Sequence, residues 1–77
     1  MTPRANRSEK DPVLVALGER VRALRDEAGL TQEAVADAAD LHWTFVGQVE
    51  RGERNLSYKN LLKLATGLSA PARELMP

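Results

Sequence analysis

The stretch from Thr31 to Arg51 constrains the fold of this chain most strongly, because its pattern is typical of two short helices joined by a tight turn. The hydroxyl of Thr31 can cap the first helix by accepting a hydrogen bond from a free N–H group of its first turn. Asp40 then interrupts the helical pattern, and aspartate tolerates the left-handed backbone that a short turn needs. His42 can cap the second helix, and Gly52 can end it by adopting a positive φ.

A repeated pairing of apolar residues marks the start of three helices. A leucine precedes each candidate cap (Thr31, His42 and Ser57), and an apolar residue follows that leucine by five positions: the pairs are Leu30 with Val35, Leu41 with Val46, and Leu56 with Leu61. Such a pair is a hydrophobic staple, in which the residue before the cap packs on the fourth residue of the helix. The three helices are therefore predicted to begin at these caps.

A further helix is expected before this segment. Asp11 can cap it, and Pro12 suits its first position because the missing N–H group would have no partner there. Its core-facing stripe, with spacings of three and four, consists of Leu14, Leu17, Val21, Leu24 and Ala28. Gly29 is expected to close this helix.

Two helices are expected after it. The helix that Ser57 caps carries several leucines and is predicted to end at Gly67. Ser69 is then predicted to cap a last short helix with Leu75 and Met76 on its apolar side. No strand pattern is present, so we predict an all-α fold of five helices.

The 77 residues suffice for one small domain. We expect it to span residues 11–77, after a flexible N-terminal tail over residues 1–10 that is either a solvated tail or a basic arm touching DNA. The opening residues do not resemble a signal peptide, and the longest apolar run, residues 13–17, is too short to cross a bilayer. A cytoplasmic protein without a membrane partner is the expectation.

Catalytic chemistry has little support in the sequence. There is no cysteine and only one histidine, so neither a metal site nor a nucleophile–base pair can be assembled from them. Glu33 and Asp37 lie one helical turn apart, but a solvated helix face explains them better than a catalytic pair. We expect no enzymatic activity, no cofactor, no metal and no small-molecule ligand.

The net charge is zero, with eleven basic and eleven acidic residues, and this alone does not favour a nucleic-acid partner. The distribution is more informative. Residues 31–42 carry three acids and no lysine or arginine, whereas Arg51, Arg54 and Lys59 cluster just after the second helix of the pair.

From Leu17 to Leu75 the chain resembles the lambda-repressor-like helix-turn-helix regulators, the XRE-type family. The resemblance rests on four motifs: V-x-x-L-R at residues 21–25, G-L-T-Q-E at 29–33, V-A-x-x-A at 35–39 and V-E-R-G at 49–52. The R-N-L-S segment at residues 54–57 resembles, more narrowly, the controller proteins of restriction–modification systems. Those are small homodimeric regulators that bind operator DNA.

The resemblance implies a sequence-specific transcriptional regulator that binds double-stranded DNA as a homodimer on a pseudo-palindromic operator, with RNA polymerase as a further candidate partner. The base-reading residues it implies are Trp43, Thr44, Gly47 and Gln48. The phosphate-binding residues it implies are Gln32, Arg51, Arg54, Asn55 and Lys59. Arg25 and Glu50 match a buried structural ion pair, and Leu68, Leu75 and Met76 are candidates for the dimer interface.

Physical reasons support most of these roles. Gln48 can pair with adenine through both atoms of its amide, and Thr44 can form a hydrogen bond or touch a thymine methyl. Gln32 stands at a helix N-terminus, where free N–H groups favour a phosphate. Gly47 would let the backbone approach the groove, and no packing demand in the sequence explains it. Trp43 either contacts DNA or folds back onto the protein.

A different class of function stays open beside this one. The chain could be a helical protein-interaction module, antitoxin-like or an adaptor, that reads no bases. The neutral net charge and the aromatic Trp43 favour that alternative.

Overall fold

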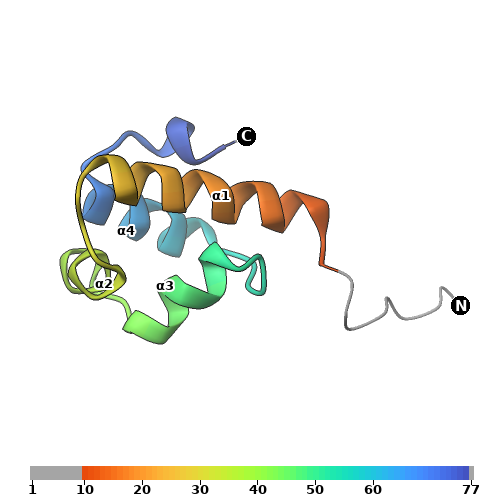
Figure 1. Cartoon of the computed structure of the whole chain (residues 1–77), viewed down its shortest axis with the longest axis horizontal. Coiled ribbons are helices and arrows are strands. Elements are labelled where there is room, and N and C mark those ends of the chain that lie inside the picture. Colours follow the sequence, from red (N-terminus) through yellow and green to blue (C-terminus); the bar gives the residue numbers. More distant parts are fainter. Residues whose placement is uncertain (1–9, 77) are drawn as a thin grey trace, which may run out of the picture.

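The computed structural model describes residues 10–76, which form an all-helical fold (Figure 1). Its elements are α1 (Pro12–Glu27), α2 (Gln32–Ala39), α3 (Trp43–Glu50), α4 (Tyr58–Leu68) and the 3₁₀ helix η1 (Ala72–Leu75). The predicted all-α class is confirmed. The predicted tail over residues 1–10 lies outside the described residues except for Lys10.

The prediction of five α-helices is wrong, because the fifth element is a single 3₁₀ helix. Within η1, Glu74 N–H donates to the carbonyl of Pro71 (2.9 Å), and Met76 N–H donates to that of Arg73 (3.2 Å). Each bond joins residues three apart, which is the pattern of a 3₁₀ helix. A segment of four residues is too short for the repeated bonds between residues four apart that define an α-helix.

The end of α4 also differs from the prediction. The helix continues through Gly67 to Leu68, and Ser69 forms its C-cap in the left-handed conformation (φ 53°) instead of capping the next helix. Gly67 is needed for close packing, since a Cβ there would lie 2.8 Å from the carbonyl oxygen of Val35 on α2. The glycine therefore allows two helices to approach and does not end one.

The predicted helix starts are confirmed by the caps. Side chains accept hydrogen bonds from N–H groups of the first turn in four helices: Asp11 from Val13, Thr31 from Ala34, His42 from Thr44, and Ser57 from Asn60. The turn between α2 and α3 has the expected left-handed residue at Asp40 (φ 57°), and positive φ values at Gly29 and Gly52 follow α1 and α3.

One apolar core joins the elements. Its buried members are Val21, Val35, Ala36, Val46, Val49, Leu64, Ala65, Leu68 and Leu75. All six residues of the three expected staples are in this cluster or packed against it. Ala28 is an exception to the predicted stripe of α1, since it is exposed and forms the C-cap of that helix.

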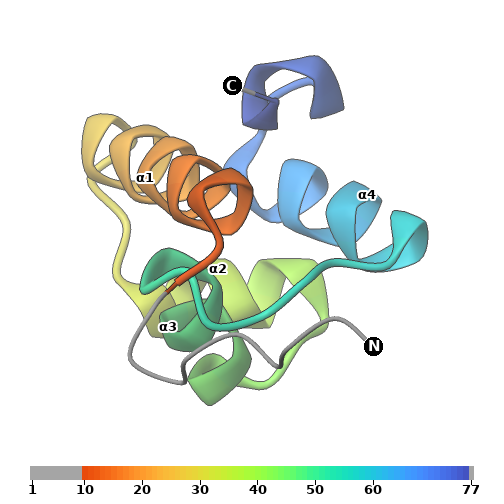
Figure 2. The ribbon, with the colours of Figure 1, turned by 90° about the vertical axis from the view of Figure 1, so that its right-hand side faces the viewer.

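The arrangement separates two ends of the molecule. Helices α2 and α3 pack against each other at one end, while η1 packs on α1 and α4 at the opposite end (Figures 1 and 2). α3 is held directly beneath α1, and α2 packs on α4. The outer side of the α2–α3 pair is therefore left for a partner.

Candidate nucleic-acid interface

The exposed row of α3 consists of Thr44 and Gln48, which lie one helical turn apart. Thr44 is exposed and Gln48 is half-buried, whereas Val46 and Val49 on the other face are fully buried in the core. Side chains four residues apart lie on the same face of a helix. The start of α3 thus presents two hydrogen-bonding side chains to solvent from a helix that cannot rotate without breaking the core.

The cap of α3 orients Thr44. Nδ1 of His42 accepts a hydrogen bond from Thr44 N–H (3.2 Å) and lies 2.7 Å from Thr44 Oγ1. A ring nitrogen that accepts carries no proton, so the hydroxyl is the donor in the second contact. The oxygen lone pairs of Thr44 and its methyl group remain for an external partner.

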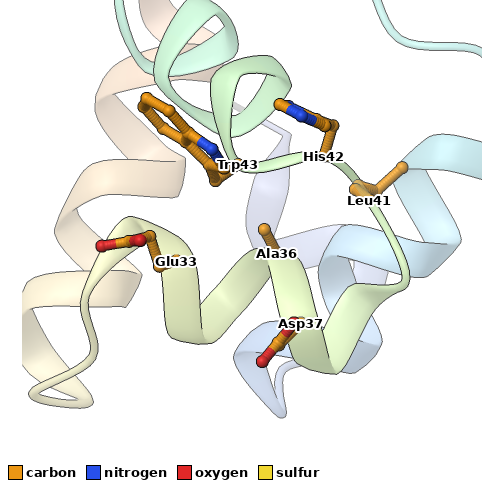
Figure 3. Close-up of a pocket in the computed structure, with 6 residues that line it drawn as sticks. All are labelled: Glu33, Ala36, Asp37, Leu41, His42 and Trp43. Atoms are coloured by element: carbon orange, nitrogen blue, oxygen red, sulfur yellow. The ribbon is translucent and has the colours of Figure 1, made fainter.

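Trp43 lies at the edge of this surface, beside a cavity of about 290 Å³. The cavity is lined by Glu33, Ala36, Asp37, Leu41, His42 and Trp43. In Figure 3, Glu33 and Asp37 project from α2, while His42 and Trp43 project from the start of α3. The indole stacks on His42 at 6.0 Å between ring centroids and is 53% exposed.

Half of Trp43 is covered by the protein and half is open, so the residue does not fold back completely, and its contact with DNA stays a prediction. The two carboxylates give this side of the molecule negative charge. Phosphate groups would be repelled there, so a duplex would have to approach α3 from the side of the α3–α4 loop.

Gly47 is buried beneath the ends of two long side chains. A Cβ at this position would lie 3.2 Å from Nη1 of Arg51 and 3.2 Å from Oε1 of Gln32. The glycine leaves room for these two side chains, which cover it. In this structure Gly47 lies beneath two of the predicted phosphate-binding side chains, and its approach to a DNA groove stays a prediction.

Arg25 and Glu50 form an ion pair with two hydrogen bonds, Nε to Oε2 at 2.6 Å and Nη2 to Oε1 at 3.0 Å. The side chains are only 14% and 4% exposed. Arg25 also donates to the carbonyl of Leu30 (2.9 Å), and its hydrogen bond to the Glu50 carboxylate raises the pKa of the Arg25 guanidinium above the ordinary value. The pair fixes the end of α1 to the end of α3.

Gln32 extends this network, and no pattern in the sequence indicated this contact. Its Nε2 donates to Oε1 of Glu50 at 3.0 Å. An amide nitrogen has two hydrogens, so one remains for a phosphate oxygen at the N-terminus of α2. The buried ion pair therefore orients a predicted phosphate-binding residue.

The remaining predicted phosphate contacts lie in and after the α3–α4 loop. Arg51, Arg54, Asn55 and Lys59 are all exposed. Nε of Arg51 pairs with Glu53 (3.2 Å), and the guanidinium carbon of Arg54 lies 5.1 Å from the ring centroid of Phe45. Oδ1 of Asn55 accepts from Leu56 N–H (2.8 Å). The loop thus carries two arginines after α3, and Lys59 follows in the first turn of α4.

The predicted dimer interface is contradicted for two of its three residues. Leu68 and Leu75 are 4% and 0% exposed, because they complete the core of the single chain. Met76 is exposed, and it lines an apolar groove with Val13 and Tyr58. Buried side chains at the C-terminal end of such a small domain fill its own core, which the sequence pattern alone could not distinguish from a subunit contact.

Comparisons with known proteins agree with this geometry. The model of a helix-turn-helix domain family matches residues 16–76. The control protein C.SmaI of Serratia marcescens is 40% identical over 60 residues, which are 78% of this chain and 71% of that protein. No helix among residues 10–76 has the length and apolar content needed to cross a membrane.

Solved structures are similar as well. The restriction–modification controller protein C.AhdI from Aeromonas hydrophila is 51% identical, with a TM-score of 0.80 over 82% of this chain and 96% of that chain. The controller protein C.Esp1396I, solved as a tetramer in complex with its natural 35 base-pair operator, is 31% identical. Its TM-score is 0.77 over 80% of this chain and 82% of that chain.

Proposed function

This chain belongs to the helix-turn-helix domain family and, within it, to the restriction–modification controller proteins, and from that membership we propose that it is a sequence-specific DNA-binding transcriptional regulator. It acts as a homodimer on a pseudo-palindromic operator and controls a restriction–modification system. α3 lies in the major groove, where base edges differ for every base pair. Phosphate contacts from the α3–α4 loop and from the start of α2 set its register.

The observation that carries this proposal is the exposed row of Thr44 and Gln48 on a helix whose opposite face is fully buried. Exposed arginines follow α3 in the loop, and Gln32 at the start of α2 keeps one amide hydrogen beyond its bond to Glu50. A helix that presents hydrogen-bonding side chains and has cations beside it fits a duplex. A surface built only for protein contact would not need that combination.

The test is selection from a random duplex pool, followed by titration of the enriched duplex at several salt concentrations. Binding to DNA predicts an enriched sequence and a steep fall of the association constant with salt, since counterions are released. Lys59→Ala should reduce the log–log slope by about one unit. A protein-interaction module would enrich no sequence, and its weak residual binding would be the same for all duplexes.

Gln48→Ala should relax the preference at one base pair of each half-site, with a loss of about 1–3 kcal/mol against the selected sequence. The reason is that the amide can form a matched pair of hydrogen bonds with adenine but not with the other bases. Competition between duplexes that differ at single base pairs measures the loss. Thr66→Ala, a change on the exposed side of α4, is the control and should leave the preference unchanged. Unaltered base preference in the Gln48 variant would show that α3 does not read that position.

The homodimer is proposed to form through the apolar groove at the start of α1 and α4. Val13, Tyr58 and Met76 line it and are 58–74% exposed, and Leu62 lies one turn after Tyr58 and is 41% exposed. Large apolar side chains gathered on one face mark an interaction site. A second copy is the occupant, since the similar controller protein C.Esp1396I assembles as a tetramer on its operator. A two-fold dimer would place its reading helices roughly 34 Å apart.

Val13→Lys should raise the dissociation constant of the dimer by roughly 30-fold, because a charge would be buried in the groove that forms the interface. Analytical ultracentrifugation at tens of micromolar measures the shift from dimer to monomer. Ala38→Lys, on α2 and outside the groove, is the matched control and should stay dimeric. A monomeric wild-type protein at that concentration would remove the homodimer from the proposal.

A further inference from the structure

The contact between Phe45 and Arg54 joins the reading helix to the loop that follows it. Phe45 is the third residue of α3, half-buried against the core, and the guanidinium carbon of Arg54 lies 5.1 Å from its ring centroid. A cation over an aromatic face is attracted by the ring quadrupole. The contact therefore holds the side chain of Arg54, in the loop, against the rigid helix α3.

Arg54 differs in this respect from the other arginines near the interface. Arg25 uses its guanidinium on Glu50 and Leu30, and Arg51 pairs through Nε with Glu53. Within residues 10–76, no carboxylate pairs with Arg54. The attraction to a ring face does not consume N–H donors, so the fork of Arg54 remains available for two oxygens of one phosphate.

The loop backbone just before Arg54 is also restrained. Gly52 has a φ of +75° and packs against α1, where a Cβ would lie 3.0 Å from Cγ2 of Val15. Glu53 N–H donates to the carbonyl of Gln48 on α3 (2.9 Å). Arg54 therefore follows a fixed backbone, and its long side chain is the remaining source of freedom.

We propose that Phe45 is a positioning residue that holds the Arg54 guanidinium ready for a DNA phosphate, so that the reading helix and the loop act as one rigid unit. The inference rests on the proposed function, because it assumes a duplex against α3. A side chain that is already ordered loses less conformational entropy when it binds. Phe45 touches no DNA in this account and acts only through Arg54.

The test is a double-mutant cycle on the selected duplex with Phe45→Leu, Arg54→Ala and the double variant. Arg54→Ala should weaken binding by roughly 10-fold, as expected for a lost charged phosphate contact. Phe45→Leu should weaken it by roughly 2–5-fold in the presence of Arg54, and by no more than the error of measurement in the Arg54→Ala background. Phe45→Tyr, which keeps the ring, should bind as the wild type does.

An NMR measurement on the free protein examines the contact without DNA. The δ-methylene protons of Arg54 should be shifted upfield by the ring current of Phe45, and Phe45→Leu should abolish the shift. Thermal unfolding shows whether Phe45→Leu folds. If it does not fold, the DNA affinity of Phe45→Tyr and the ring-current shift of Arg54 in the wild type test the proposal instead.

Three results would overturn the proposal. One is an equal loss of affinity for Phe45→Leu in both backgrounds, which would mean that the residue acts through helix packing. Another is an Arg54 resonance without ring-current shift. The third is a wild-type protein that binds no duplex, which would also remove the proposed function, although the ring-current shift would still show the contact itself.

Discussion

Glu50→Ala is expected to lower the free energy of unfolding by about 3–5 kcal/mol, because it leaves the guanidinium of Arg25 inside the protein without its partner. The two side chains are 14% and 4% exposed and joined by two hydrogen bonds. Gln32 would lose its acceptor at the same time. A domain of this size has only about 3–5 kcal/mol of stability from one core, so the variant should be largely unfolded. Urea unfolding followed by circular dichroism measures the loss.

Glu53→Ala is the matched control, since Glu53 also pairs with an arginine. The distance between Arg51 Nε and Glu53 Oε2 is 3.2 Å, but both side chains are well exposed. An exposed pair contributes at most about 1 kcal/mol, so this variant should remain folded. Similar losses in the two variants, or a Glu50→Gln variant with an unchanged melting temperature, would contradict the structural role of the buried pair.

The pH dependence of this contribution follows from the direction of the shift. The hydrogen bonds that Arg25 donates to Glu50 raise the pKa of its guanidinium above the ordinary value in the folded state. A group with a raised folded pKa stabilises the protein below its unfolded pKa, and that stability is lost as the pH rises through the folded pKa. The contribution of Arg25 is therefore constant across the neutral range.

Gly18→Ala should have the second large effect, a loss of about 3 kcal/mol of stability together with displacement of α3. Gly18 is buried where α1 crosses the end of α3, and a Cβ there would overlap the carbonyl oxygen of Val49 and lie 2.6 Å from that of Glu50. Backbone atoms cannot rotate away as a flexible side chain can, so the helices must separate. Operator affinity measured on the folded fraction should fall as well, because Thr44 and Gln48 move with α3.

Gly29→Asn provides the comparison for Gly18. Gly29 has a φ of +70°, and nothing lies within 4 Å of a Cβ built there. Asparagine tolerates the left-handed conformation, so a loss below about 1 kcal/mol is expected and operator affinity should be unchanged. If Gly18→Ala proved as mild as this substitution, the close approach of α1 and α3 would not be a requirement of the fold.

Local patterns in the sequence were sufficient to predict where the four α-helices begin. A cap such as Thr31 and a staple such as Leu30 with Val35 act within five residues, so their effect does not depend on distant parts of the chain. The end of the chain could not be predicted in the same way. Whether Leu75 fills its own core or meets a second subunit depends on how η1 packs on α1 and α4, and this packing is a tertiary property.

The candidate site likewise has features that local patterns predict and features that depend on tertiary packing. Helical spacing was enough to place Thr44 and Gln48 on one exposed face. The burial of Gly47 beneath Gln32 and Arg51 depends on contacts between α2, α3 and the loop, which a single sequence does not specify. The contact of Arg54 with Phe45 depends in the same way on the conformation of the loop.

The central claim is that the start of α3 enters the groove of a duplex, and NMR mapping with the selected duplex tests it most directly. Titration of the isotope-labelled protein should shift the resonances of Thr44 and Gln48 most strongly, along with those of Gln32 and of the loop at Arg54. The groove lined by Val13, Tyr58 and Met76 should be unaffected, since it belongs to the dimer contact. Strong shifts confined to that groove, with residues 43–48 unchanged at saturation, would contradict the account.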